Sequence, residues 1–241
     1  MTNKTSNEQL GKAMVVVAHP DDAEWGCSGT VAKWCRLGWE VVYVLCTDGS
    51  KGTENRNISG KDLARIRQSE QQKAGEILGL KDIVFLDYPD GYLEPTLELR
   101  KDITREIRRH RPEILVTTNP KRDLINSNHL GHPDHYAAGE ATASAVFPSA
   151  RDHLTFPDLL NEGLEPHKVK ELWIMTYGEN TNNFSPIDEI DVEKSTQALL
   201  AHVSQISDPE RGSKWIRKRR QELGEMAGTE FAESFKIFKL R

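Results

Sequence analysis

Two short clusters of ionisable residues contain the side chains in this chain that are best suited to chemistry. Residues 19–22 read His-Pro-Asp-Asp and directly follow the apolar run 13–18, while residues 132–135 read His-Pro-Asp-His. A run of small and β-branched apolar residues is typical of a buried parallel strand. Charged groups at the end of such a strand are costly unless they are paired or bound to a metal. The clusters therefore indicate a functional site rather than a stabilising feature.

Together the clusters offer the groups of a metal-assisted hydrolase. Two imidazoles and a carboxylate with an open position for water form a catalytic zinc arrangement, in which the metal lowers the pKa of water and polarises a carbonyl. A spare carboxylate in the first cluster could serve as general base. A spare histidine in the second, paired with Asp134, would stay protonated and could stabilise an oxyanion or protonate a leaving amine. This combination predicts hydrolysis of an amide or ester.

The elements that must position these residues alternate between strand and helix. The apolar runs and their glycine or proline boundaries predict strands over 13–18, 41–46, 83–86 and 113–118, and helices over 26–37, 61–80, 95–110 and 135–146. This alternation predicts an α/β fold with a mostly parallel sheet and helices on both faces. Ligands bind beyond the carboxyl ends of parallel strands, so both clusters are expected at one sheet edge.

The C-terminal part is expected to elaborate this core. The patterns predict a loop-rich cap over 147–169, a strand over 171–177, helices over 196–206 and 209–226, and an edge strand over 229–239. We expect a flexible lead over 1–12 and a single domain over 13–241. Its Rossmann-like core would cover 13–146, and the cap and C-terminal elaboration would cover 147–241.

Composition excludes several classes of function. The 241 residues carry a net charge of −5 with both signs spread along the chain, which disfavours a nucleic-acid partner. No stretch approaches about 20 consecutive apolar residues, so no membrane span is predicted. The first twelve residues lack the apolar segment of a signal peptide. Three cysteines without C-x-x-C spacing favour reduced thiols and a cytoplasmic location.

The first cluster and its surroundings resemble a known family. Residues 18–30 read Ala-His-Pro-Asp-Asp-Ala-Glu-Trp-Gly-Cys-Ser-Gly-Thr and closely resemble the opening motif of the PIG-L/LmbE-like de-N-acetylases, and residues 132–135 resemble their second motif. Weaker similarity covers 67–70, 88–91 and 201–205. The resemblance spans roughly residues 13–206 and implies a Rossmann-like, zinc-dependent enzyme that removes acetyl groups from 2-acetamido sugars and their conjugates.

The resemblance also implies roles for individual residues. His19, Asp22 and His135 would hold one metal ion per chain, either Zn²⁺ or another divalent ion. Asp21 would be the general base, and His132 would face the oxyanion or the leaving amine.

Supporting roles follow in the same way. Asp134 would orient the second-cluster histidine, and Arg67 with Asp90 would contact substrate. Many relatives read Asp-Asp-Glu in the first motif, whereas here an alanine precedes Glu24, which leaves the role of that residue open. The role of His202 is also open: it could be a core residue, a helix cap or part of the site.

Other interpretations compete with these. Arg67 could instead pair with Glu70 on a helix surface. The His-x-Asp pattern also suits a non-haem iron oxygenase, although those enzymes generally use all-β barrels. A nucleotide-binding module would need a G-x-G-x-x-G run that the chain lacks. Within the family, hydration of an unsaturated dicarboxylate or hydrolysis of a non-sugar amide remains an alternative. The expected partner is a small acetamido sugar, with a homo-oligomer left open.

Overall fold

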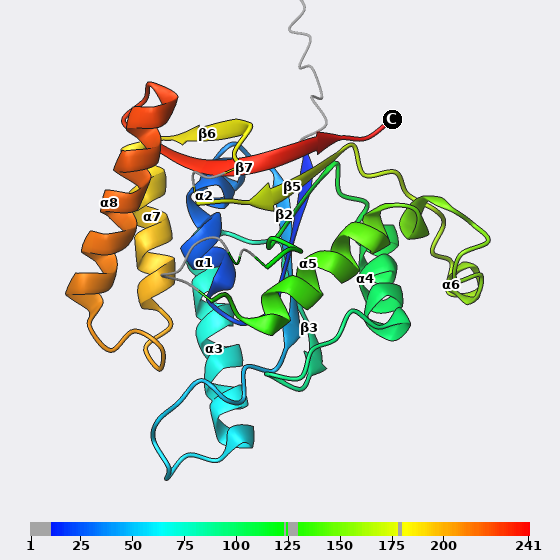
Figure 1. Ribbon diagram of the computed structural model, residues 1–241, viewed down its shortest axis with the longest axis horizontal. Coiled ribbons are helices and arrows are strands. Elements are labelled where there is room, and N and C mark those ends of the chain that lie inside the picture. The colour runs from blue at the N-terminus through cyan, green and yellow to red at the C-terminus, as the bar shows by residue number, and fades with distance from the viewer. Residues whose placement is uncertain (1–10, 123, 125–129, 178–179) are drawn as a thin grey trace, which may run out of the picture.

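The computed structural model describes residues 11–122, 124, 130–177 and 180–241 (Figure 1). Its strands form one sheet in the order β3-β2-β1-β4-β5-β7-β6. The first five strands in that order are parallel, and β7 is antiparallel to both of its neighbours. The strands are β1 (Lys12–Val17), β2 (Glu40–Thr47), β3 (Asp82–Tyr88), β4 (Ile114–Thr117), β5 (Glu171–Met175), β6 (Asn183–Ile187) and β7 (Phe231–Lys239). The predicted, mostly parallel sheet is confirmed.

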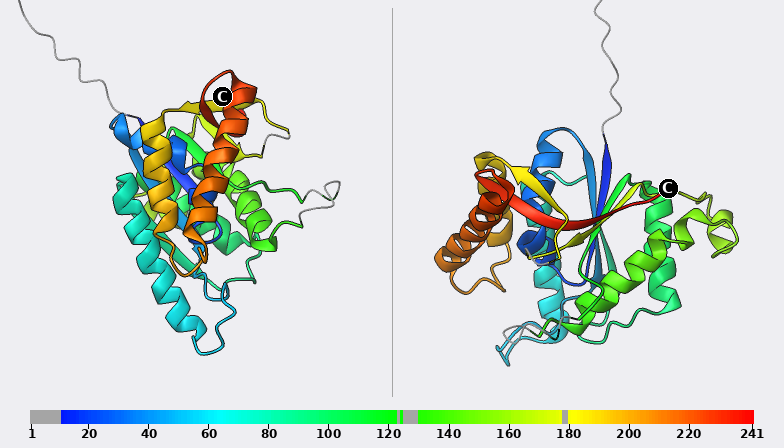
Figure 2. Two further views of the ribbon diagram at one scale, coloured as in Figure 1. Left: turned by 90° about the vertical axis from the view of Figure 1, so that its left-hand side faces the viewer. Right: turned by 45° about the horizontal axis from the view of Figure 1, so that its top comes forward.

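Helices cover both faces of this sheet, as expected (Figures 1 and 2). One face packs against α4 and α5, and the other against α2, α3 and α7, with α8 outside α7 and against β7. The helices are α1 (Asp22–Gly26), α2 (Ser28–Arg36), α3 (Gly60–Leu78), α4 (Leu97–His110), α5 (Pro133–Val146), α6 (Asp158–Asn161), α7 (Glu189–Leu200) and α8 (Pro209–Ala227).

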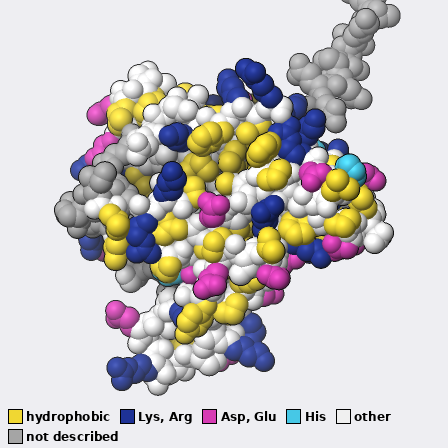
Figure 3. Space-filling view, turned by 45° about the vertical axis from the view of Figure 1, so that its right-hand side comes forward, with side chains coloured by type: hydrophobic (Ala, Val, Ile, Leu, Met, Phe, Trp, Pro, Cys, Tyr) yellow, Lys and Arg dark blue, Asp and Glu magenta, His cyan; other side chains and the backbone are white. Residues whose placement is uncertain are grey.

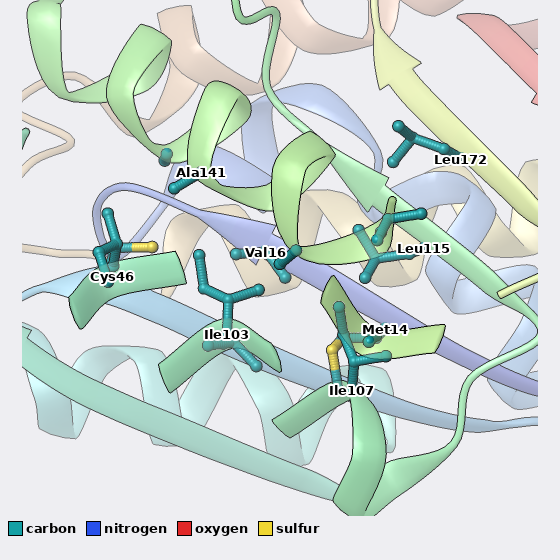
Figure 4. Close-up of a cluster of buried hydrophobic side chains, with 14 of the residues drawn as sticks. Met14, Val16, Cys46, Ile103, Ile107, Leu115, Ala141 and Leu172 are labelled. Carbon is teal, nitrogen blue, oxygen red and sulfur yellow. The ribbon is translucent and has the colours of Figure 1, made fainter. Parts of the chain in front are cut away.

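The central strand β1 divides the core between the two faces. Met14 and Val16 pack with Ile103 of α4 and Leu115 of β4 (Figure 4), whereas Val15 packs in the cluster on the opposite face. Successive side chains of a strand point to opposite faces, so β1 after Lys12 is apolar on both sides and buried. This rigid strand leads directly into the first ionisable cluster.

Two expectations need correction, and one strand was not expected. The C-terminal strand β7 is not at the edge, because β6 pairs along its outer side. The sequence did not predict β6 itself, a short segment whose Pro186 suits an edge strand but hides the strand pattern. The helix expected over 196–206 is α7, which begins seven residues earlier because Asp188 and Asp191 form a capping box, and which ends at Leu200, so residues 201–206 are not helical.

The start of the chain and the first helix also differ in detail. Residues 1–10 of the expected lead lie outside the described residues, and Lys12 already belongs to β1. The helix expected over 26–37 corresponds to α2, and the short helix α1, which was not expected, precedes it; Cys27, whose backbone is not helical, lies between them. The domain boundaries stay a prediction.

A buried ion pair joins the C-terminal elements to the core. The carboxylate of Glu233 on β7 accepts hydrogen bonds from the backbone N–H groups of Gly29 and Thr30 at the start of α2, at 2.9 and 2.7 Å. Arg220 of α8 lies 3.0 Å from the same carboxylate, and both side chains are almost fully buried. A negative charge at a helix N-terminus is favourable, so this pair fixes α2, α8 and β7 together.

Glu233→Gln is expected to lower the free energy of unfolding by about 3–5 kcal/mol, because it leaves the buried Arg220 guanidinium without its counter-charge. Urea denaturation measures the loss. Glu189→Gln is the matched control, since the Arg217–Glu189 pair is more than 40% exposed on both sides and should cost less than about 1 kcal/mol. Equal effects of the two variants would contradict this account of the pair.

The described surface is mixed in character. On the face shown in Figure 3, basic and acidic side chains are interspersed with hydrophobic ones. Among the described residues, no helix has both the length and the apolar character that crossing a membrane requires. All three cysteines are free thiols.

Candidate active site

The two ionisable clusters meet at the carboxyl edge of the parallel strands, as the sheet argument predicts. β1 ends at Val17 and the chain turns through residues 18–21 into α1, while β4 ends at Thr117 and the later helix α5 is capped by His132. The rings of His19 and His132 are 4.7 Å apart. Residues more than 100 positions apart in the sequence therefore share one site.

Three side chains form a compact group of metal-ligand type: His19, Asp22 and His135. His19 Nδ1 lies 3.3 Å from His135 Nε2 and 3.5 Å from Asp22 Oδ2, and His135 Nε2 lies 3.0 Å from Asp22 Oδ1. Ligand atoms of a tetrahedral zinc site, with bonds of about 2.0–2.1 Å, are separated by about 3.3 Å. The three residues fit a divalent metal ion.

The charge around His19 supports the same conclusion. Its other ring nitrogen, Nε2, lies 3.1 Å from Asp90 and 3.2 Å from Asp134. Although burial disfavours the charged imidazole, hydrogen bonds with Asp134, Asp22 and Asp90 raise the pKa of His19 to about 12. Three carboxylates around one imidazole favour a positive charge in this position. A metal on Nδ1 would supply it, with carboxylates holding the Nε2–H as metal-bound histidines commonly require.

A second group with ligand spacing shares His19 and adds Asp90, His132 and Asp134. In this group the Asp134 carboxylate already accepts the backbone N–H groups of Gly91 and Leu93, at 2.7 and 3.2 Å. Its oxygens are therefore occupied within the protein. The group of His19, Asp22 and His135 is the better candidate for a metal.

His132 differs from the expectation of a protonated histidine held by Asp134. Its Nδ1 accepts the backbone N–H of Asp134 at 3.2 Å but lies 3.9 Å from the carboxylate, which is directed at His19 instead. Burial and the neighbouring His19 lower the pKa of His132. Because Nδ1 accepts, the neutral ring carries its proton on Nε2 and can donate from there.

Asp21 occupies a conformation that few residues adopt. Its φ is 94°, in the region where non-glycine residues are uncommon and which clusters at functional sites. The backbone N–H of Asp21 donates to Gln71 Oε1 at 3.2 Å, and Arg67 lies 3.5 Å from its carboxylate. Burial, reinforced by the charge of Asp22, raises the pKa of Asp21 to about 7. Such a carboxyl group suits proton transfer near neutral pH.

Arg67 is buried rather than paired with Glu70 on the helix surface. Its guanidinium donates to the carbonyl oxygens of Gly49 and Pro20. Asp90, 4.0 Å from Arg67, accepts the backbone N–H of Lys51. Both side chains therefore hold the loop around residue 50 against the first cluster. Their expected contact with substrate stays a prediction.

Sequence reasoning missed a buried polar chain behind Asp21. Gln71 donates from Nε2 to Glu24 Oε1 at 3.2 Å, and Glu24 lies 3.3 Å from His202, with all three side chains fully buried. The sequence leaves the roles of Glu24 and His202 open and gives no signal for Gln71. The contacts join α1, α3 and the turn that follows α7, which are far apart in the sequence. Through Gln71, this series of buried polar side chains holds the backbone N–H of Asp21 in place.

The site opens into a cavity of about 750 Å³ whose lining includes Asp22 and His135. Asp21 and His132 lie on the sheet-edge loops around the same group of ligands. A divalent metal, a carboxyl group that can exchange a proton and a neutral histidine donor are the elements of metal-assisted hydrolysis.

Comparisons with known proteins support this chemistry. A family model described as "PIG-L: GlcNAc-PI de-N-acetylase" matches residues 14–146, more than half of the chain. Diacetylchitobiose deacetylase of Thermococcus kodakarensis is 34% identical over 228 residues, covering 94% of this chain and 82% of that protein. The structure of N,N'-diacetylchitobiose deacetylase from Pyrococcus horikoshii with its inhibitor MPG has a TM-score of 0.85 at 30% identity, covering 95% of this chain and 84% of that one.

A third similarity concerns the fold alone. GalB, the 4-carboxy-2-hydroxymuconate hydratase of Pseudomonas putida KT2440, has a TM-score of 0.77 at 18% identity, covering 96% of this chain and 97% of that one. The resemblance seen in the sequence and the expected α/β fold are both confirmed by the family match and the closely similar deacetylase structure. The chain belongs to the PIG-L family of metal-dependent de-N-acetylases.

Proposed function

We propose that this protein is a zinc-dependent hydrolase that removes the N-acetyl group from an N-acetylglucosamine-type sugar or conjugate. The observation that carries the proposal is the group of His19, Asp22 and His135 at ligand spacing, next to the half-buried Asp21 carboxyl. The named activities of the similar deacetylases support the acetamido-sugar substrate. We expect a cytoplasmic enzyme, and leave a homo-oligomer open.

In the proposed reaction, His19, Asp22 and His135 hold the zinc ion, which when bound lowers the pKa of water and polarises a carbonyl oxygen. Asp21 takes a proton from the water that attacks the acetamide carbon. The Nε2–H of His132 donates a hydrogen bond to the carbonyl oxygen as negative charge develops there. The C–N bond then breaks, acetate and a free amine leave, and the proton held by Asp21 passes to the amine.

The neighbouring residues hold these groups in place. Asp134 and Asp90 accept the Nε2–H of His19 and so fix which ring nitrogen faces the metal. Arg67 bridges the carbonyl of Pro20 and the carboxylate of Asp21. We also propose that Arg67 and Asp90 shape the wall that meets the acetamido sugar.

The direct test is release of primary amine from a panel of N-acetylglucosamine compounds by zinc-loaded protein, with a chelated sample as control. Chelator-sensitive release is expected. The absence of release by protein with stoichiometric zinc would contradict deacetylation of these sugars, and would favour a non-sugar amide or hydration of an unsaturated dicarboxylate instead.

Gln71→Leu is expected to lower kcat by about 10-fold with little change in KM or zinc content. The variant removes the acceptor for the Asp21 backbone N–H and leaves the Glu24 carboxylate without its donor, which costs about 1–3 kcal/mol of stability. Steady-state kinetics and metal analysis measure the effect. If Gln71 acts through Asp21, adding Gln71→Leu to an Asp21→Asn variant should lower kcat little further. A fully additive loss would contradict a positioning role.

A further inference from the structure

The cavity beside the candidate metal ligands lies on one side of them. Of the residues proposed to act on the metal, the proton or the sugar, all of which the structure describes, only Asp22 and His135 line it. Arg67 and Asp90, the proposed sugar contacts, lie 4.0 Å apart. Asp90 is 3.1 Å from His19 Nε2, whereas the ligand group lies on the Nδ1 side of that ring. An amide at the ligands, with its sugar on Arg67 and Asp90, therefore directs its acyl group into the cavity.

The wall that such an acyl group would meet is apolar. It is built from α1, the end of β5, the segment before α8, and α8 itself, by Trp25, Met175, Tyr177, Ile206 and Trp215. Helix α8 lies on the outer side of the molecule beside α7 (Figure 2, left). The rings of Trp25 and Trp215 pack edge to face with centroids 5.3 Å apart. A Cβ on Gly26 would collide with Met175 Sδ, so the glycine allows this side chain to pack against α1.

The charged groups of the lining are satisfied without a ligand. Apart from the two candidate metal ligands, the charged residues are Asp208, Arg211 and Arg219. The Asp208 carboxylate accepts the Arg211 backbone N–H at 2.9 Å. The Arg219 guanidinium lies over the Tyr177 ring, 5.5 Å from its centroid, and donates to the Tyr177 carbonyl oxygen. Arg211 is exposed to solvent at the start of α8. The surface that remains for a ligand beside the tryptophans is apolar.

The cavity is much larger than an acetyl group. Its volume of about 750 Å³ falls within the roughly 300–1,000 Å³ of pockets that are lined mainly by hydrophobic and aromatic side chains and take drug-sized ligands. The methyl group of an acetamide would leave most of this space unfilled. Each further methylene buried against such a wall strengthens binding by about fourfold.

We propose that the cavity receives acyl chains longer than acetyl, so that the protein also hydrolyses medium-chain N-acyl amides of an amino sugar. The oxygen of water bonds to the acyl carbon, the C–N bond breaks, the amine takes the proton held by Asp21, and a medium-chain carboxylate leaves. This inference rests on the proposed function, because it places the amide at Asp22 and His135. Trp215 contacts the chain and not the reacting atoms, so it acts on acyl specificity.

The test compares kcat/KM for N-hexanoylglucosamine with kcat/KM for N-acetylglucosamine. The hexanoyl compound is expected to be favoured by at least about 10-fold, because its added methylenes are buried. Trp215→Ala should remove most of this preference, and Trp215→Phe should retain it. Phe238→Ala is the matched control, since Phe238 is 45% exposed and lies on β7 outside this cavity. A preference for the acetyl compound, or a preference unchanged in Trp215→Ala, would overturn the inference.

A second substrate tests which side of the amide the cavity serves. Hexyl β-N-acetylglucosaminide carries the same chain on the glycosidic oxygen instead of the acyl carbon. Its kcat/KM should be close to that of N-acetylglucosamine and should not respond to Trp215→Ala. A Trp215-dependent gain with this glycoside, and none with the hexanoyl amide, would assign the cavity to the aglycone and overturn the acyl chain as its occupant.

Binding of the acyl product separates this inference from the proposed function. Calorimetric titration of the zinc-loaded protein with hexanoate and with acetate involves no turnover, and hexanoate should bind at least about 10-fold more tightly. Trp215→Ala should abolish the difference. Trp215-dependent binding of hexanoate without amine release from any amino sugar would support the acyl cavity and contradict the proposed hydrolase. Amine release from N-acetylglucosamine, with equal binding of the two acids, would do the reverse.

Discussion

Replacing His135 with alanine is expected to remove the bound metal and to lower turnover by about 1,000-fold or more. His135 Nε2 lies within 3.3 Å of both His19 Nδ1 and Asp22, so the substitution leaves two ligands where at least three are needed. Loss of the metal removes several kcal/mol of transition-state stabilisation, and each 1.36 kcal/mol is about tenfold in rate. Metal content by elemental analysis and amine release from a responsive sugar measure the two effects.

The same experiment distinguishes the two ligand groups, which share only His19. His132→Ala should keep the metal and lose part of the turnover if the first group holds the ion, whereas it should lose the metal if the second group does. His153→Ala is the control, because His153 is 69% exposed and lies beside Asp152, away from the site. Full zinc occupancy in His135→Ala would remove this residue from the ligand set.

The order of strands and helices in the first part of the chain could be predicted because its signals are local. β1 and β2 are valine-rich runs of mostly buried apolar residues, and Gly79 ends α3 in the left-handed conformation. β6 could not be predicted in this way, since Pro186 interrupts its pattern and its pairing partner β7 lies some 50 residues further on. The edge position wrongly given to β7 follows from the same omission.

The meeting of the two clusters was predictable, but their partners were not. Parallel strands bring their carboxyl ends to one edge whatever the side chains are, so both clusters were expected at that edge. His19 and His132 lie close together because β1 and β4 are neighbours in the sheet. Which carboxylate faces which histidine depends on rotamers and on distant loops: Asp134 is directed at His19 because the backbone N–H groups of Gly91 and Leu93 hold its oxygens. Spacing along the chain carries no signal for such contacts.

Asp21→Asn is expected to lower kcat by about 100- to 10,000-fold while sparing the metal, because it removes the proposed general base and leaves the proposed metal ligands intact. Asparagine tolerates a positive φ, so it can keep the φ of 94° and the hydrogen bond to Gln71, where alanine would add backbone strain. The amide cannot take a proton from water at neutral pH. We expect KM for the sugar to change little, and kinetics with parallel zinc analysis measure both quantities.

Asp87→Asn is a closely matched control, since Asp87 is exposed and also has a positive φ, of 56°, but its carboxylate accepts from Gln68 outside the site. The control should turn over like the unmodified protein. Loss of zinc from Asp21→Asn would mean that this carboxylate serves the metal rather than the water, and unchanged kcat would mean that it does neither. Asp21 and Asp22 are adjacent, but Asp22 contacts both His19 and His135. The left-handed conformation of Asp21 turns the two carboxylates apart, and the proposed division between base and ligand rests on that turn.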